Sequence, residues 1–179
     1  MRLPKPRIDP LPESEWSDEV RELLPKSPDG KLRPLNIFTT LARYPKLLKR
    51  WQVFGNHVLA KSTLPARERE LVILRTGHLC KSGYEFHQHT RIGLAAGLTS
   101  DEIAKLQRAA SEWTGKDAAL IRATDELHAD QFISEVTWKE LAQSWNQQQL
   151  MDLVFAIGQY TLVSMALNSF GVQIEEGSK

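Results

Sequence analysis

Along most of this chain, apolar residues recur at three- and four-residue spacing, the pattern of helices that bury one face. No run shows the period-two alternation of a half-buried strand. The pattern therefore predicts an all-α protein. The clearest stripe comprises Leu47, Leu48, Trp51, Phe54, Val58 and Leu59. We expect helices over residues 13–24, 36–44, 45–61, from about 65 onward, 83–96, 101–110, 116–130, from 137 onward and 147–169.

Start and stop signals support these boundaries. Pro65 suits the first turn of a helix, and Gly97 suits a carboxyl-terminal cap. Two segments, Thr99-Ser-Asp-Glu102 and Thr137-Trp-Lys-Glu140, have the form of a capping box. Each capping box predicts that a helix begins there.

Proline is concentrated at the front of the chain, and none follows Pro65. Proline fixes the backbone in extended conformations and interrupts helices. We therefore expect an extended amino-terminal arm with one short helix over residues 1–35. A single helical domain, a bundle without internal repeats, is expected over residues 36–179.

Charge and composition exclude several classes of protein. The chain of 179 residues carries 23 Lys and Arg against 22 Asp and Glu, so no basic patch favours nucleic acid or an anionic membrane. We expect no apolar stretch to reach the ~20 residues of a membrane span. The amino terminus lacks the apolar core of a signal peptide. The single cysteine, Cys80, cannot close an internal disulfide. We expect a cytoplasmic protein.

The densest group of chemically capable residues lies between Arg67 and His89. Glu85 and His89 stand four residues apart, which places them on one face of a helix, about 5–6 Å apart at Cβ. A carboxylate beside an imidazole fixes its tautomer and makes a usable acid or base. Glu70 precedes them and reaches the same face if the two helices pack as a hairpin.

Two other interpretations of this group stay open. The Glu85 and His89 pair is also common on solvated helix faces. A zinc or iron site is the second alternative, because His87 and His78 lie nearby and Asp125-Glu-Leu-His128 supplies another carboxylate and imidazole. The zincin motif and paired E-x-x-H helices are both absent from the sequence, so we expect no metal.

Several segments resemble the carboxymuconolactone decarboxylase family of the alkyl hydroperoxidase D-like superfamily, and together they cover most of the chain from about residue 45 onward. They are Leu64-Pro-Ala-Arg-Glu-Arg-Glu-Leu-Val-Ile-Leu-Arg75, Ser82-Gly-Tyr-Glu-Phe-His-Gln-His89, Ile92-Gly-Leu-Ala-Ala-Gly-Leu-Thr-Ser-Asp-Glu-Ile103 and Leu162-Val-Ser-Met-Ala-Leu-Asn-Ser-Phe-Gly171. The resemblance implies the alkyl hydroperoxidase D-like helical fold.

Peroxidase members of that superfamily carry a glutamate followed by C-x-x-C-x-x-x-H. With the histidine placed on His89, the glutamate falls on Glu70 and the cysteine positions fall on Ser82 and Glu85. Cys80 is out of register by two residues. Chemistry that needs a peroxidatic and a resolving thiol is therefore impossible within one chain.

The resemblance then implies the branch that lacks the cysteine pair. Its expected activity is a cofactor-free decarboxylation of a small carboxylated lactone, with His89 as proton donor or acceptor, Glu85 orienting it and Glu70 as second carboxylate. Candidate substrate-binding residues are Ser82, Tyr84, Arg75 and Arg91. The family also implies a homo-oligomer based on dimers or trimers, with a small molecule as partner.

Two further functions remain as alternatives. Cys80 alone, with an external thiol, would give an alkylhydroperoxidase-like antioxidant. A helical oligomer that has lost the reaction would be a non-catalytic scaffold.

Overall fold

The computed structural model describes residues 1–26, 32–175 and 177. Apart from one isolated bridge between Lys26 and Leu32, these residues form helices and no strand, so the all-α prediction is confirmed. Residues 27–31 of the expected arm, and residues 176, 178 and 179 of the expected helical domain, lie outside the described part.

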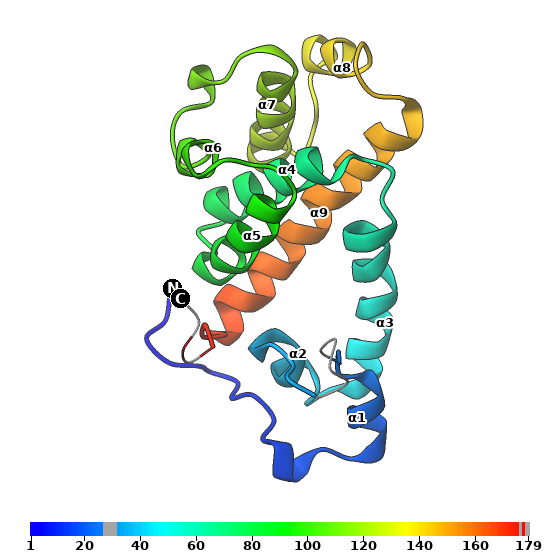
Figure 1. The fold of residues 1–179 in the computed structure, drawn as a ribbon, viewed down its shortest axis with the longest axis vertical. Helices are drawn as coiled ribbons and strands as arrows, with labels where there is room; N and C mark the ends of the chain where they lie inside the picture. Colours follow the sequence, from blue (N-terminus) through cyan, green and yellow to red (C-terminus); the bar gives the residue numbers. More distant parts are fainter. Residues whose placement is uncertain (27–31, 176, 178–179) are drawn as a thin grey trace.

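The described chain forms nine α-helices, with α9 running diagonally through the molecule (Figure 1). Helices α7 and α8 lie at one end, and α1 and α2 lie at the other. Their bounds are α1 (Asp18–Leu23), α2 (Asn36–Leu41), α3 (Pro45–Asn56), α4 (Ala66–Leu79), α5 (Gly83–Ala95), α6 (Ser100–Lys105), α7 (Gly115–Asp130), α8 (Glu135–Leu141) and α9 (Gln147–Phe170).

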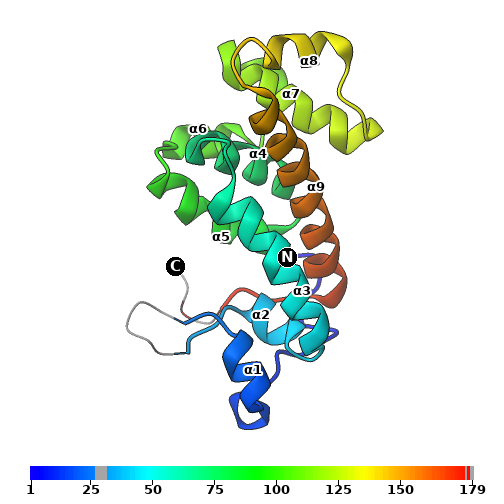
Figure 2. The same cartoon turned by 90° about the vertical axis from the view of Figure 1, so that its right-hand side faces the viewer.

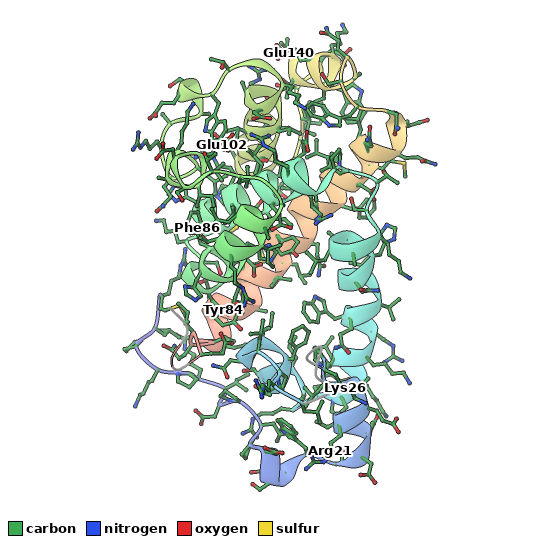
Figure 3. The ribbon with its side chains drawn as sticks, in the orientation of Figure 1. Arg21, Lys26, Tyr84, Phe86, Glu102 and Glu140 are labelled. Carbon is green, nitrogen blue, oxygen red and sulfur yellow. The ribbon has the colours of Figure 1, made fainter. Side chains whose placement is uncertain are left out.

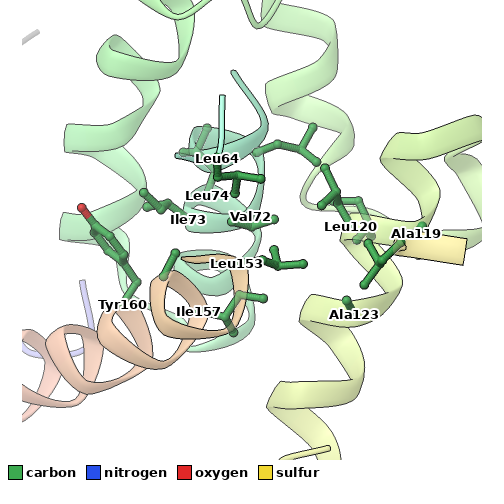
Figure 4. Close-up of a cluster of buried hydrophobic side chains, with 14 of the residues drawn as sticks. Leu64, Val72, Ile73, Leu74, Ala119, Leu120, Ala123, Leu153, Ile157 and Tyr160 are labelled. Carbon is green, nitrogen blue, oxygen red and sulfur yellow. The ribbon is translucent and has the colours of Figure 1, made fainter. Parts of the chain in front are cut away.

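The main hydrophobic core lies where α4, α7 and α9 pack together (Figure 4). Leu74, Leu120 and Leu153 contribute one fully buried side chain from each of these helices, and burial of such a side chain stabilises the fold by about 1.5–3 kcal/mol. Every residue of α4 from Glu70 to Gly77 is buried. Polar groups on this enclosed helix must therefore find partners within the protein.

The amino-terminal arm and the first three helices form a second layer at the lower end of α9. Figure 2 shows α1 and α2 below this end of α9, and Ile37 of α2 and Trp51 of α3 pack against a buried cluster that includes Val163 and Leu167 of α9. The arm is pinned there because the N–H groups of Arg7 and Ile8 donate to the carbonyl of Phe170 at 2.8 and 3.2 Å. Gly171 ends α9 in the left-handed conformation with φ +71°, as the cap of a helix often requires.

Several predicted helix boundaries need correction. The helix expected over 13–24 is α-helical only over Asp18–Leu23, and the one expected over 36–44 ends at Leu41. The helix expected over 45–61 stays α-helical only to Asn56, and residues His57–Lys61 widen into a π-helical turn. The helix expected over 101–110 ends at Lys105. Pro65 is the residue before α4 and not part of its first turn.

One of the two predicted capping boxes is confirmed and the other is wrong. Thr99 and Glu102 exchange the expected hydrogen bonds at the start of α6. Thr137 instead lies buried inside α8, where its hydroxyl donates to Glu126 at 2.7 Å. Ser134 caps that helix, because its hydroxyl accepts from the N–H of Thr137.

Helix α9 is long and apolar enough to cross a membrane by length and composition, which the sequence analysis did not expect. Its most apolar window has a mean hydropathy of 1.6, and 50% of that window is buried inside the molecule. The core helix of a globular protein has the same properties, because it is apolar on more than one face.

Candidate active site

Helices α4 and α5 form a tight hairpin that sets their inner faces against each other. Lys81 adopts the left-handed conformation with φ +54°, and the N–H of Ser82 then donates to the carbonyl of Gly77 at 2.8 Å. This bond closes the end of α4 in the Schellman arrangement. Since a left-handed residue other than glycine costs roughly 1–2 kcal/mol, the packing of α5 on α4 must offset it.

The hairpin places both ring nitrogens of His89 against carboxylates. Nδ1 lies 2.6 Å from Oε2 of Glu70, and Nε2 lies 2.9 Å from Oε1 of Glu85. The expected placement of Glu85 and His89 on one helix face is confirmed, as is the approach of Glu70 from the preceding helix. The structure therefore brings the three predicted catalytic residues into one chain of contacts.

This group is enclosed by protein and is not solvated. The side chains of Glu70, Glu85 and His89 are 0%, 6% and 7% exposed. Burial alone would lower the pKa of His89, but the charge of Glu85 and the hydrogen bonds to both carboxylates outweigh it and raise the pKa to about 9. His89 is therefore a cation at neutral pH, with an N–H directed at each carboxylate.

Glu70 is fixed from two sides. One carboxylate oxygen faces His89, and the other accepts from Nε of Arg69 at 3.3 Å. Because Glu70 is fully buried, these contacts replace the hydration that the carboxylate loses on folding.

The imidazole of His89 also packs against α9. The ring of Tyr160 meets it edge to face, with 4.8 Å between ring centroids and an interplanar angle of 83°. Burial, followed by the charges of Glu85 and Glu70, raises the pKa of Tyr160 well above its ordinary value. Tyr160 therefore remains a neutral phenol that can donate a hydrogen bond.

A cavity of about 620 Å³ opens beside His89 and Glu85, between α2 and α3 on one side and α5 and α9 on the other. Glu70 is absent from its lining and stands behind the imidazole. Aromatic rings form much of the wall, which suits a small cyclic molecule. They are Phe38, Trp51, Tyr84 and Tyr160, with Gln52, Gln88, Gln159 and Arg91 as polar members of the lining.

Two of the four predicted substrate-binding residues line this cavity. The side chain of Arg91 has no ion pair or hydrogen bond within the described chain, so its guanidinium is available to a ligand. Tyr84 lies at the end of α5 nearest α2 (Figure 3). Its hydroxyl donates to Glu175 at 2.6 Å and accepts from the N–H of Ile37.

The other two predicted substrate-binding residues do not line it. Arg75 is a structural cation, because its guanidinium holds both oxygens of Asp125 at 2.7 and 2.8 Å and also binds the carbonyls of Leu106 and Arg108. Ser82 is buried at the start of α5 and faces a different pocket. Neither side chain meets His89.

Sequence reasoning missed the residues that α9 and α3 contribute to the cavity. Gln159 was the available signal, since it is a polar residue in the middle of the most apolar helix and is only 6% exposed. Trp51 belongs to an apolar helical stripe and Tyr160 lies in an apolar segment, so neither stands out from its neighbours in the sequence. Their positions depend on how α3 and α9 approach α5, which no local pattern encodes.

Cys80 lies away from the cavity, at the end of α4. It is half-buried, and its Sγ is 3.8 Å from Nδ1 of His128. Burial raises the pKa of its thiol, so little thiolate forms at neutral pH. Among residues 1–26, 32–175 and 177, no three side chains of His, Cys, Asp or Glu are grouped so as to hold a metal ion.

Comparison with known proteins identifies the family of this segment. Residues 45–127, which include Glu70, Glu85 and His89, match the model of the Carboxymuconolactone decarboxylase family. This part of the chain is therefore similar to the carboxymuconolactone decarboxylase family, as its motifs indicated. A search of curated proteins found no match.

Several solved structures share the fold, among them one with an alkylhydroperoxidase AhpD core. An uncharacterized peroxidase-related protein with an AhpD core from Ralstonia eutropha JMP134 superposes with a TM-score of 0.82 at 16% identity, over 94% of this chain and 92% of that one. A peroxidase-related protein from Silicibacter sp. TM1040 gives 0.74 at 16% identity, over 99% and 93%. The debrominase Bmp8 gives 0.74 at 12% identity, over 95% and 92%.

Proposed function

We propose that this protein is a cofactor-free carboxy-lyase that acts on a small carboxylated lactone or a related cyclic acid. The observation that carries the proposal is the buried imidazolium of His89, held between Glu70 and Glu85, with its Glu85 side open to an aromatic cavity. The decarboxylase name of the matching family supports the same chemistry.

The proposed reaction needs a group that protonates carbon after CO2 has left. When the bond to the substrate carboxylate breaks, its electron pair stays on the ring as a dienolate. The proton held between His89 and Glu85 moves to that carbon, and a proton from water then restores the pair. Such acid catalysis typically contributes 10²–10⁴-fold to the rate.

In this scheme the two carboxylates would have different duties. Glu85 lines the cavity and therefore stands between the imidazole and the substrate. Glu70 lies behind, where it fixes the ring and stabilises its charge. Proton transfer at the substrate would thus run through Glu85, a more direct role than the orienting one that the family resemblance implies for it.

Arg91 and Tyr160 complete the proposed substrate site. Arg91 would bind a substrate carboxylate, for which a guanidinium is well suited. The phenol of Tyr160 would donate to the carbonyl oxygen on which charge develops. Both line the same cavity as Glu85 and His89.

A turnover screen tests this function. Wild-type protein would be assayed with carboxylated lactones and with organic hydroperoxides, each with and without a dithiol, beside His89→Ala. We expect CO2 release from at least one lactone, independent of dithiol and lost in His89→Ala with the helical circular dichroism intact. Full activity in His89→Ala would refute the assignment.

Peroxidase chemistry through Cys80 has less support. Cys80 lines neither the aromatic cavity nor the wider pocket beside α5, and burial raises the pKa of its thiol.

The structural neighbour Bmp8 is a debrominase, and a cysteine-to-alanine variant of it was crystallised with 2,3,4-tribromopyrrole. A small cyclic ligand would suit the aromatic cavity here as well, but this cavity contains no cysteine. A scaffold without activity would show no turnover anywhere in the screen.

A further inference from the structure

A second, wider pocket lies on the outer side of α5 and takes no part in the proposed reaction. Its volume is about 1010 Å³, and it extends from the turn between α4 and α5 to Met1 and Arg2 of the arm. It adjoins the His89 cavity, since Leu35, Gln88 and Arg91 line both. We call it the basic pocket.

The charges around the basic pocket are all of one sign. Arg2, Lys81 and Arg91 line it, and none of its described lining residues is an aspartate or glutamate. Within the described chain the side chains of Lys81 and Arg91 make no hydrogen bond or ion pair, and the guanidinium of Arg2 has only a long contact of 3.4 Å to the carbonyl of Cys80. Three cations that face one concave space without counter-charges favour an anionic occupant.

The start of α5 adds neutral donors to the same pocket. Ser82 lines it and is 1% exposed, yet its Oγ has no hydrogen-bond partner among the described residues. No side chain caps α5, so the N–H groups of its first turn have no partner within the helix and carry the positive end of the helix dipole. A buried hydroxyl without a partner is uncommon, and an anion bound here would satisfy it.

The carboxylate next to this pocket is already engaged. Glu175 follows the lining residue Ile174, and it accepts from the N–H of Asn36, the hydroxyl of Tyr84 and the side-chain amide of Gln88. Three neutral donors hold it, and no ion pair among the described residues joins it to Arg2, Lys81 or Arg91. It therefore does not neutralise the cations of the basic pocket.

One wall of the basic pocket is apolar. Helix α5 contributes Phe86, which is labelled in Figure 3, and Leu94 to this wall. The other apolar members of the lining include Leu35 and Ile174. A bare inorganic anion would leave this wall unused. The lining thus combines a site for a charged group with a surface for a hydrocarbon or aromatic body.

We propose that the basic pocket binds an organic anion, with its phosphate or carboxylate group at Ser82, Lys81 and Arg2, none of which lines the His89 cavity, and its apolar body against Phe86 and Leu94. The site is separate from the reacting groups, so its occupancy does not depend on the chemistry assigned to His89.

Calorimetric titration with three matched probes tests the proposal: 1-naphthyl phosphate, 1-naphthoate and 1-naphthol. They share one apolar body and differ in charge. We expect 1-naphthyl phosphate or 1-naphthoate to bind at least about tenfold more tightly than 1-naphthol, with affinity falling as salt is raised. The tighter of the two anions identifies the preferred group. Equal affinity for all three probes would overturn the proposal.

Variants locate the binding. The double variant Arg2→Gln/Lys81→Asn should weaken binding of the anionic probe about fivefold or more, and asparagine tolerates the left-handed backbone at position 81. Ser82→Ala should weaken it with the fold intact, because no described residue binds that hydroxyl. The matched control is Lys139→Gln on α8, a cation 72% exposed at the other end of the molecule, which should change nothing.

The result of this binding experiment does not depend on whether the proposed reaction is correct. His89→Ala should keep the affinity for 1-naphthyl phosphate even where it abolishes turnover. Unchanged affinity in both Arg2→Gln/Lys81→Asn and Ser82→Ala, or an equal loss in Lys139→Gln, would show that the anion binds elsewhere. Loss of turnover in His89→Ala bears only on the decarboxylase proposal.

Discussion

At the scale of single residues, His89 is unusual because it is buried and yet charged. A buried histidine normally loses its proton, since a low-dielectric surrounding disfavours the cation. Here Glu70 and Glu85 occupy both ring nitrogens, and their attraction outweighs the cost of burial. The site therefore holds a proton ready for transfer at physiological pH.

The first prediction concerns the titration of His89. Its imidazole should titrate with a pKa of about 9, measured from the Cε1 proton shift by NMR. Removal of one flanking charge in Glu70→Gln should lower that pKa. A wild-type imidazole that titrates at its ordinary value of 6.5 would contradict the geometry.

The same shift makes stability depend on pH in a defined direction. The folded pKa of His89 is raised above the unfolded value of 6.5, so its contribution to the free energy of unfolding is complete below about pH 6.5. That contribution is lost as the pH rises through about 9, and it is of the order of a few kcal/mol. Urea unfolding at several pH values, in wild type and His89→Ala, measures the difference.

The sequence was sufficient to predict the centre of the site but not its walls. Glu85 and His89 follow from helical spacing, and Glu70 follows from the family motif. Tyr160 and Gln159 were missed because their place depends on the approach of α9. Arg75 was a wrong choice for the substrate because nothing local shows that Asp125 and two carbonyls would hold it.

At the scale of elements, the close approach of α5 to α4 makes the site possible. A Cβ added at Gly93 on α5 would lie 3.1 Å from side-chain carbons of both Leu74 and Leu98. Glycine at this position lets the hairpin close. The Cβ of Glu70 would lie 3.8 Å from the same added atom. The close approach of the two helices lets the Glu70 carboxylate reach His89.

The second prediction follows from that contact. Gly93→Val should lower the free energy of unfolding by about 1–3 kcal/mol, because the added carbons overpack the interface between α4 and α5. The control is Ala104→Val at an exposed position of α6, which adds a branched side chain away from the interface between α4 and α5. This change should lower the free energy of unfolding by at most about 0.7 kcal/mol. A neutral Gly93→Val would show that the hairpin has room to adjust.

Helix existence was predictable from periodicity, but some helix ends were not. Thr137 and Glu140 match a capping box in sequence, yet Ser134 begins the helix three residues earlier. The competing interaction is tertiary, because Glu126 on α7 binds both Ser134 and Thr137. A cap chosen by a neighbouring helix cannot be read from the segment itself.

At the scale of the whole molecule, α9 leaves a stripe of apolar side chains exposed. Met151, Phe155, Leu162 and Met165 are each more than half exposed and share one face by their spacing. Phe54 of α3 extends the stripe through an edge contact with Phe155. Contiguous apolar surface of this kind marks interaction sites in many proteins. We propose that a second copy of the chain covers it, in line with the homo-oligomer that the family resemblance implies.

The third prediction tests that assembly. Phe155→Glu should reduce the mass measured by light scattering after gel filtration to that of a smaller assembly or a monomer, because a charge cannot be buried unpaired at an apolar contact. Gln143→Glu adds the same charge at an exposed position outside α9 and should leave the mass unchanged. A monomeric wild type at ~100 μM would rule out the interface.

The fourth prediction addresses the central claim, that the proton delivered to the substrate comes from the Glu85 and His89 pair. It is measured as the kcat of CO2 release on the carboxylated lactone that the screen identifies, in Glu85→Gln, Glu70→Gln and the control Lys139→Gln. We expect kcat to fall by about 10²-fold or more in Glu85→Gln, to fall less in Glu70→Gln, and to stay unchanged in the control. Full kcat in a folded Glu85→Gln variant would contradict this account of the site.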